Sequence, residues 1–159
     1  MKIKVVSIGK IKEKYLLAGI KEYTKRLQAF TKIEFFELED EKIPDKATTA
    51  QEEQIKEKEG KRLLEKIKDD EYVILLDLHG KELDSVELSQ HLEKMMISGK
   101  STITFVIGGS LGLSKDVIQR SNFRLCFSKL TFTHQMIKLF LLEQIYRSFK
   151  IMNHQVYHK

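Results

Sequence analysis

The residue types best suited to ligand chemistry gather in the last third of the chain. Gly108, Gly109 and Gly112 follow the apolar run Ile103–Ile107, and Ser114 comes just after them. This order predicts a strand, a glycine turn and a helix that Ser114 caps. Such a connection leaves backbone N–H groups free to hold a polar ligand at the edge of a sheet.

A second loop in the same region has the composition of a binding site. The apolar run Phe123–Phe127 predicts a strand, the stretch Ser128–Thr133 follows it, and a long apolar helix is expected from His134. Connections that leave parallel strands in the same direction lie at the same edge of the sheet. We therefore expect the glycine turn and this second loop to lie together.

The glycine turn by itself indicates little, because glycine after a strand is more often an ordinary turn than a ligand cradle. It lacks the Gly-x-Gly-x-x-Gly spacing of a dinucleotide site and the Gly-Lys-Ser/Thr of a P-loop. The pattern argues against a nicotinamide cofactor and against ATP hydrolysis.

Neither the cysteine nor the histidines predict a metal site. Cys126 is the single cysteine and lies in an apolar strand, which favours a buried structural thiol over a nucleophile. His154 and His158 stand four residues apart, but no carboxylate or thiol close by in sequence completes a coordination shell. We expect the chain to bind no metal.

The elements that must position these loops follow from the apolar periodicity of the rest of the chain. Six further elements are expected ahead of the strand Ile103–Ile107, with strands at Lys2–Ile8, Lys32–Leu38 and Tyr72–Leu76 and helices at Glu13–Leu27, Ala50–Ile67 and Asp84–Met96. Strands that alternate with helices are typical of an α/β fold with a mostly parallel sheet and helices on both faces. The length of 159 residues and the hydrophobic content of 42% fit one domain, residues 1–159.

Taken together, the motifs resemble those of the RlmH family. The resemblance lies in the Gly-Gly-x-x-Gly turn, in Phe-Ser-Lys-Leu-Thr-Phe-x-His-Gln-Met from Phe127, in Glu143-Gln-x-Tyr-Arg147 and in the ending Tyr157-His158-Lys159. The opening Val-x-x-Ile-Gly-Lys-Ile-Lys-Glu-Lys-Tyr, Lys58-Glu59-Gly60 and the Asp77-Leu-His-Gly-Lys-x-Leu segment extend it over essentially the whole chain. Members of the family are SPOUT-superfamily methyltransferases that modify a pseudouridine in bacterial 23S ribosomal RNA.

The resemblance implies a fold, a methyl donor and a set of site residues. The fold would be a SPOUT-type α/β fold with a C-terminal trefoil knot, which the periodicity alone does not suggest because knots are rare. The donor, S-adenosylmethionine, would sit among three loops and contact Leu76, Gly108, Phe127, Ser128, Lys129, Leu130, Thr131 and Phe132. The residues implied to act on the reacting base are His134, Tyr157, His158 and Lys159.

Plainer roles for the same residues stay open at this stage. The loop residues could be simple strand ends, His134 a plain first residue of a helix, and the last three residues a frayed terminus. The tail nevertheless combines an aromatic ring that can stack on a base, an imidazole that can exchange a proton and a cation for phosphate. We therefore expect it to have a functional role.

Two positions depart from the family pattern. The family usually has proline where this chain has Thr133 and arginine where it has Lys138. Thr133 leaves the turn before the helix less fixed than proline would. Lys138 keeps the charge but loses the planar guanidinium that suits phosphate.

The charge distribution favours an anionic partner. The net charge is +5 overall, but residues 101–159 carry eight lysines and arginines against two acidic residues, a net of +6, and residues 1–100 carry −1. Basic charge beside the expected site favours nucleic acid first among anionic partners, and a merely solvated basic face would be the preferred interpretation without the other features that point to RNA. No run is long enough for a membrane span and the N-terminus is not a signal peptide, so a cytoplasmic protein is expected.

The helix expected from His134 to Ile151 is apolar on more than one side. A surface helix needs only one apolar stripe, so the surplus must be buried in the core or against a partner. A homodimer through this helix is the expected arrangement.

The sequence thus predicts an S-adenosylmethionine-dependent enzyme that methylates N3 of a pseudouridine in 23S ribosomal RNA, as the resemblance implies. Two alternatives remain beside it. One is a SPOUT methyltransferase with a different RNA target, and the other is a module of the same fold that binds RNA or a nucleotide without chemistry.

Overall fold

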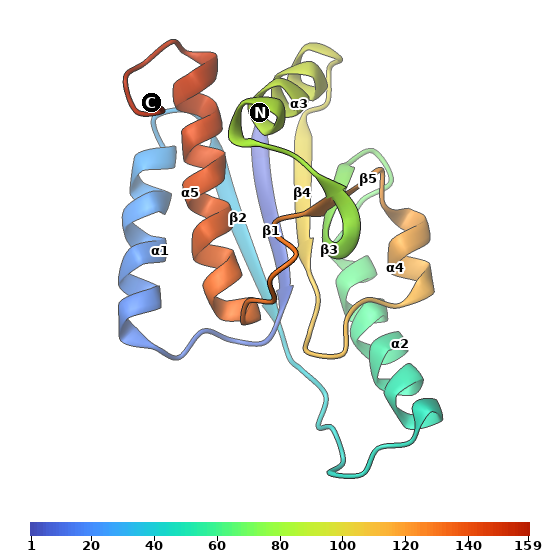
Figure 1. Cartoon of the computed structure of the whole chain (residues 1–159). Helices are drawn as coiled ribbons and strands as arrows, with labels where there is room; N and C mark the ends of the chain where they lie inside the picture. The colour runs from blue at the N-terminus through green and yellow to red at the C-terminus, as the bar shows by residue number, and fades with distance from the viewer.

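Five parallel strands form one sheet in the order β2-β1-β4-β3-β5. The computed structural model describes residues 1–159. In chain order the strands are β1 (Lys2–Ile8), β2 (Lys32–Leu38), β3 (Tyr72–Glu82), β4 (Thr102–Ile107) and β5 (Phe123–Cys126). Figure 1 shows the sheet with helices on both sides of it. The expected α/β fold with a parallel sheet is confirmed, and the trefoil knot stays a prediction.

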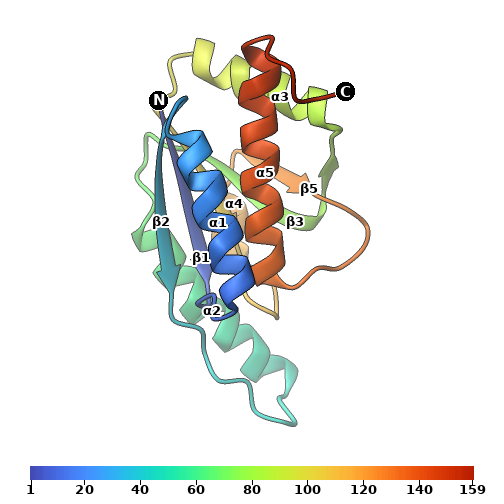
Figure 2. The same cartoon turned by 90° about the vertical axis from the view of Figure 1, so that its left-hand side faces the viewer.

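The helices divide between the two faces of the sheet. The five are α1 (Lys14–Leu27), α2 (Thr49–Glu65), α3 (Ser85–Ile97), α4 (Lys115–Arg120) and α5 (His134–Met152). Helices α1, α3 and α5 cover one face, where α5 packs between the other two, and α2 and α4 pack together on the opposite face (Figures 1 and 2). None of these helices has the length and apolar character needed to cross a membrane.

Each face of the sheet has its own hydrophobic core, as the period of two along a strand requires. Ile3 and Val5 of β1 point to the α1, α3 and α5 side, where they share a core with Phe105 and with buried residues of α5. Val6 and Ile8 point to the other side, where the core is completed by α2 and α4.

Strand β3 is longer than the sequence indicated. The prediction ended it at Leu76, whereas the structure continues it to Glu82, with a register shift against β5 between Leu76 and Lys81. Gly80 permits this second stretch of pairing, because a Cβ there would lie 2.6 Å from the backbone carbonyl atoms of Arg124. The segment Asp77–Gly80, which does not pair with β5, is thereby held between the two paired stretches of β3. We call it the displaced segment.

Side chains at the helix N-termini fix where the helices begin. Thr48 and Asp84 form capping boxes on α2 and α3, and Ser114 accepts the Val117 N–H at the start of α4, as predicted. Thr133 does the same for α5: its Oγ1 accepts the Met136 N–H at 3.2 Å. Its φ of −62° is close to the value that proline imposes, so the exchange of proline for threonine leaves this turn well defined.

Candidate active site

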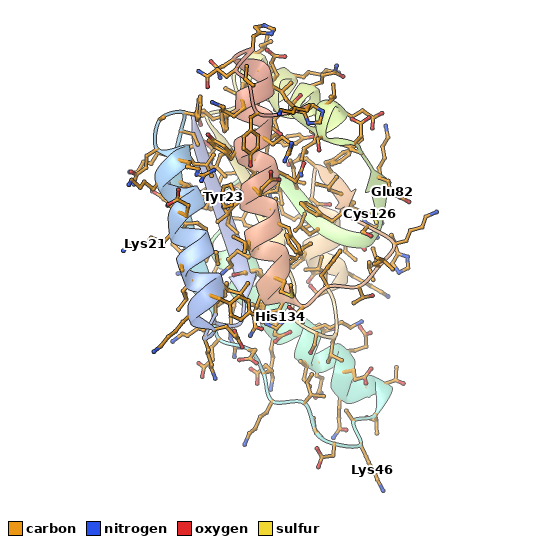
Figure 3. The ribbon with its side chains drawn as sticks, turned by 60° about the vertical axis from the view of Figure 1, so that its left-hand side comes forward. Lys21, Tyr23, Lys46, Glu82, Cys126 and His134 are labelled. Carbon is orange, nitrogen blue, oxygen red and sulfur yellow. The ribbon has the colours of Figure 1, made fainter.

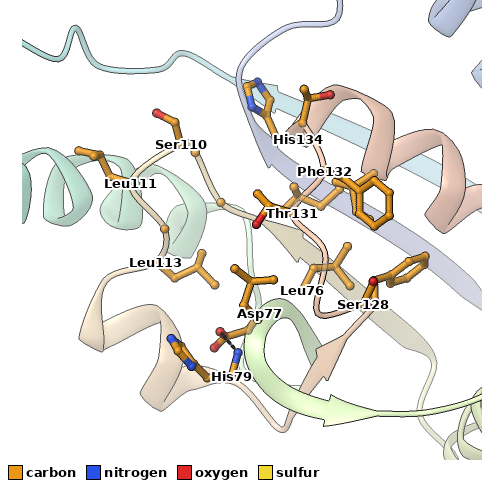
Figure 4. A pocket seen from close by; sticks show the side chains of 18 of the residues that line it. Leu76, Asp77, His79, Ser110, Leu111, Leu113, Ser128, Thr131, Phe132 and His134 are labelled. Atoms are coloured by element: carbon orange, nitrogen blue, oxygen red, sulfur yellow. Dashed lines mark hydrogen bonds between the residues drawn. The ribbon is translucent and has the colours of Figure 1, made fainter.

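A cavity of about 850 Å³ opens at the carboxyl edge of the sheet (Figure 4). Three connections line it, namely the end of β3 with the displaced segment after Leu76, the turn after β4, and the loop between β5 and α5. Lys56 of α2 and Ile118 of α4 complete the wall. The volume lies within the range of small-molecule sites, so the cavity is large enough for a nucleoside-sized ligand.

Seven of the eight residues implied to contact the donor line this cavity. They are Leu76, Gly108, Phe127, Ser128, Leu130, Thr131 and Phe132. Lys129 is the exception, since it is strongly exposed and its Nζ lies 3.7 Å from Glu82 Oε1 on the adjacent strand. The expectation that the glycine turn and the second loop lie together is confirmed.

The glycine turn has the tight geometry that its sequence indicates. The Gly112 N–H donates to the Gly109 carbonyl at 3.1 Å, and Gly112 has φ +94°, a conformation that side chains rarely allow. A Cβ on Gly108 would lie 2.9 Å from Leu113 Cδ2 and 3.2 Å from the Gly112 carbonyl oxygen. Glycine is therefore required at position 108 so that Leu113 and the Gly112 carbonyl can pack against it. The cavity wall formed by the turn depends on this packing.

The loop between β5 and α5 is held by its own hydrogen bonds. The buried Cys126 thiol donates to the Ser128 carbonyl at 3.2 Å, and Ser128 Oγ accepts the Leu130 N–H at 3.0 Å. Phe132 packs edge-on against Phe140 of α5, with ring centroids 5.5 Å apart. Cys126 is a buried structural thiol, as predicted.

The cavity also contains an ion pair that the sequence reasoning missed. Arg124 Nε and Nη2 lie 2.7 Å and 2.6 Å from Asp77 Oδ2. The His79 N–H donates to Asp77 Oδ1 at 2.9 Å, as the dashed line in Figure 4 marks. Both side chains of the pair line the cavity. The signal was present, because Asp77 and His79 follow the apolar run of β3 and Arg124 contributes to the basic surplus. The separation of 47 positions between Asp77 and Arg124 hides their contact.

His134, the first residue of α5, reaches the cavity from the opposite wall (Figure 4). A Cβ on Gly9 would lie 2.9 Å from His134 Nε2, so the imidazole packs directly on the backbone at the end of β1. The Thr133 cap fixes the helix start that carries it. This histidine is held in place by two separate segments of the chain.

Lys138, one turn further along α5, lies in the interior. Its Nζ pairs with Glu37 Oε2 at 3.3 Å, and the same carboxylate oxygen accepts the Ile11 N–H at 3.0 Å. Burial lowers the pKa of the Lys138 ammonium, against the attraction of Glu37. In the free chain this side chain faces a carboxylate and only 3% of it is exposed, so it is not placed to bind a phosphate.

The last three residues fold back along the C-terminal half of α5, beside Glu143 and Arg147. The Tyr157 hydroxyl donates to Glu143 Oε1 at 2.9 Å and lies 3.4 Å from the Tyr23 hydroxyl of α1, while Arg147 covers the Tyr157 ring. Arg147 Nη1 and His158 Nδ1 are 3.3 Å apart. Burial, with the hydrogen bonds to Tyr23 and Glu143, raises the pKa of the Tyr157 hydroxyl well above its ordinary value, so it stays protonated at neutral pH.

The structure therefore does not bring the tail and His134 together within one chain. His134 opens α5, and the tail folds back only as far as Glu143, nine residues further along, which is about 14 Å along a helix. Figure 3 shows His134 at the start of α5 and well apart from Tyr23, whose hydroxyl lies against the tail. Of the four residues implied to act on the base, only His134 lines the cavity of its own chain.

The chemistry of the lining fits S-adenosylmethionine. Leu76, Leu113, Leu130 and Phe132 can cover an adenine ring, and the glycine turn brings main-chain polar groups to the same wall. The Asp77 carboxylate and Lys56 offer partners for the ammonium and the carboxylate of an amino acid. Three His, Cys, Asp or Glu side chains do not come together anywhere in the structure in a way that could hold a metal ion.

A parallel α/β sheet whose carboxyl edge carries a three-loop cavity defines a nucleotide- or nucleoside-binding class of protein. A family model described as "Predicted SPOUT methyltransferase" matches residues 1–158. The curated relatives include proteins named "Ribosomal RNA large subunit methyltransferase H" from Enterococcus faecalis, 56% identical, and from Clostridium beijerinckii, 52% identical, each over all 159 residues of both chains. A protein of Clostridium perfringens with the name "Ribosomal RNA large subunit methyltransferase H 1" is 55% identical over the same span. The chain belongs to the RlmH family of SPOUT methyltransferases, which confirms the resemblance.

Proposed function

We propose that this protein transfers a methyl group from S-adenosylmethionine to N3 of a pseudouridine in bacterial large-subunit (23S) ribosomal RNA. The observation that carries the proposal is the meeting of three loops, matched in sequence to the donor-binding loops of the family, around one cavity. The name that the full-length relatives carry supports ribosomal RNA as the substrate class. The site of action would be the cytoplasm, where ribosomes are found.

The loops would bind and orient the donor, and apolar side chains would exclude water from it. S-adenosylmethionine, when bound, supplies an electrophilic methyl group. Leu76 and Phe132 would enclose its adenine, while main-chain groups of the glycine turn and of the β5–α5 loop would fix its orientation. Holding two reactants in line contributes much of the rate of such a transfer.

His134 is the residue of this chain best placed to act on the reacting base. The imide N3–H of a uracil ring is a weak acid, so the transfer is helped by a group that takes the proton or stabilises the developing anion. An imidazole can accept a proton or donate a hydrogen bond, and the ring of His134 lies at the cavity wall.

The tail would act on the cavity of a second copy of the chain. Leu130, Phe132 and Phe140 form an exposed apolar patch beside the cavity, which suits a homodimer interface involving α5. A two-fold axis perpendicular to α5 would set two such helices antiparallel, so that the C-terminal end of one helix lies beside the start of the other. Tyr157, His158 and Lys159 of one subunit would then lie near His134 of the other.

Sedimentation equilibrium tests the dimer. The wild-type protein is expected at about twice the 18.6 kDa chain mass, and Phe140→Glu, which places a charge on the patch, is expected to give monomers. A wild-type monomer at micromolar concentration would contradict the arrangement.

A transfer assay with labelled donor tests the reaction. Purified ribosomes, separated subunits and protein-free ribosomal RNA are each incubated with the enzyme, and the labelled nucleotide is mapped by nuclease digestion and mass spectrometry. We expect label on N3 of one pseudouridine of the large-subunit RNA. Label on another nucleotide would favour a different RNA target, and donor binding without any label would favour a module that only binds.

A further inference from the structure

Helix α2 contains a buried pair that its composition does not explain. Most of the helix is charged and exposed, yet Glu59 is only 5% exposed and Gly60 beside it is buried too. Removing a carboxylate from water is costly unless it gains specific contacts. A buried Glu59 must therefore have specific contacts. Both Glu59 and Gly60 contact the segment that contains the glycine turn.

Glu59 lies directly against the start of that turn. A Cβ on Gly109 would be 2.9 Å from Glu59 Oε1 and 3.3 Å from Oε2, so the carboxylate packs on the Gly109 backbone with no space between them. At the end of the turn, a Cβ on Gly60 would lie 2.3 Å from Ser114 Oγ. Adjacent residues of α2 thus contact both ends of the segment that lines the cavity, and Figure 4 shows Ser110 and Leu111 of the turn alongside this helix.

The carboxylate is itself held by the linker between β2 and α2. Glu59 Oε2 accepts the Glu41 N–H at 3.1 Å. Arg62, one turn further along α2, fixes the same linker, since it pairs with the Glu41 carboxylate and its Nη1 donates to the Glu39 carbonyl at 2.8 Å. Burial raises the pKa of the Glu59 carboxyl, opposed by the Glu41 hydrogen bond. Burial thus disfavours the charged form, and the Glu41 N–H requires only an acceptor oxygen, which an amide side chain also offers.

We infer that Glu59 is a positioning residue for the methyl-donor site: wedged between the β2–α2 linker and Gly109, it holds the turn Gly108–Leu113 in the shape that the donor requires. The inference rests on the proposed function for the identity of the ligand. Glu59 does not line the cavity itself, so it acts through Gly109.

The first test compares three variants by calorimetric titration with S-adenosylmethionine. Glu59→Ala leaves the Glu41 N–H unpaired and a space beneath the turn, so donor affinity is expected to fall about tenfold. Glu59→Gln keeps an acceptor of the same shape and is expected to bind like wild type. Glu57→Ala, on the exposed side of the same helix, is the matched control and is expected to change nothing.

The second test asks whether the effect passes through Gly109. Gly109→Ala puts a methyl group 2.9 Å from Glu59 Oε1 and should weaken donor binding, whereas in the Glu59→Ala background only Ile8 Cγ2, at 3.3 Å, remains close to it. The effects of the two substitutions are therefore expected to be strongly non-additive. Additive losses, or a Glu59→Ala variant with wild-type affinity, would overturn the inference, and so would a Glu59→Gln variant as weak as Glu59→Ala.

Hydrogen exchange of the free protein separates this inference from the proposed function. Amides of residues 109–113 are expected to exchange faster in Glu59→Ala than in Glu59→Gln or Glu57→Ala, without any ligand present. If the wild-type protein binds no S-adenosylmethionine, the proposed function fails, and the exchange rates still decide the role of Glu59. Should Glu59→Ala not fold, Glu59→Gln and Gly109→Ala give the same comparison, and equal exchange in these two variants would overturn the inference.

Discussion

His134 combines two properties that a catalytic group needs, a fixed position and access to the cavity. Thr133 caps the helix that starts with it, and the backbone of Gly9 packs on its ring. A side chain restrained on two sides loses little freedom when a substrate binds. At the scale of single residues, this makes His134 the first position to test.

Replacing the imidazole should separate donor binding from chemistry. His134→Ala is expected to bind S-adenosylmethionine nearly as wild type does, while methyl transfer to ribosomes falls about a hundredfold, the scale of a lost proton-transfer group. Calorimetry measures the first quantity and labelled donor the second. His154→Asn is the matched control, because His154 has φ +53°, which asparagine tolerates, and lies beyond the far end of α5. Transfer at the wild-type rate in His134→Ala would remove His134 from the catalytic residues.

His91 of α3 should make stability depend on pH. Burial, with the nearby charges of Lys94 and Lys81, lowers the pKa of His91 below its usual 6.5, and its ring contacts Tyr72 and Phe123. The folded state therefore disfavours the protonated ring, and the stability present above the usual pKa is lost as pH falls through the lowered value. The free energy of unfolding in urea is expected to drop between about pH 7.5 and about pH 5 more in wild type than in His91→Gln.

The control for this measurement is His79→Gln, an exposed histidine on the displaced segment of β3, which should keep the wild-type dependence on pH. Identical pH dependence in wild type and His91→Gln would show that His91 does not carry the effect.

Most of the residues proposed for the donor site could be predicted from sequence to line one cavity, because each set is a short continuous segment. Gly108 and the stretch Phe127–Phe132 are continuous segments next to predicted strands, and the family resemblance assigned them together. The pair of Asp77 and Arg124 was not accessible, since its partners stand on different strands. The separation of the tail from His134 depends on the length and direction of α5, which a list of residues does not contain.

At the scale of elements, α5 depends on its cap because its first turn carries no acidic residue to interact with the helix dipole. Thr133→Ala removes the acceptor of the Met136 N–H and is expected to lower the free energy of unfolding by about 1 kcal/mol. Thr133→Ser keeps the hydroxyl and should retain most of that stability. Chemical denaturation of the three proteins measures both differences, and equal stability in all three would show that the cap contributes nothing.

The periodicity of the sequence located nearly every element but not the polar contacts between them. Strand β1 was predicted with its observed bounds, yet Lys4, which the alternation would place in solvent, is buried and pairs with Glu71 at 2.6 Å. In helix α2, the apolar positions do not indicate that Glu59 and Gly60 are buried as well. A charged residue is buried only where a distant segment supplies its partner, and periodicity carries no information about that segment.

At the scale of the whole molecule, mixing two inactive variants tests whether sites are shared between subunits. One variant is His134→Ala and the other lacks residues 157–159, and both are expected to bind donor and transfer little. Co-expressed chains form heterodimers in which one of the two sites has both His134 and an intact tail from the partner. Activity of about a quarter of wild type is expected, because half of the dimers are mixed and each has one intact site. If the tail acted within its own chain, mixing would restore nothing.

The placement of α5 over β1 also bears on how the chain folds as it is made. Ile3 and Val5 belong to the same core as Leu141, Leu142 and Ile145, near the other end of the sequence. A ribosome delivers the chain from its N-terminus at about 5–20 residues per second. The face of β1 that carries Ile3 and Val5 therefore stays uncovered until α5 has been synthesised. The opposite face needs nothing beyond α4 and can close earlier. The unfinished chain therefore exposes an apolar surface until synthesis is nearly complete, and chaperones that bind nascent chains would find their target there.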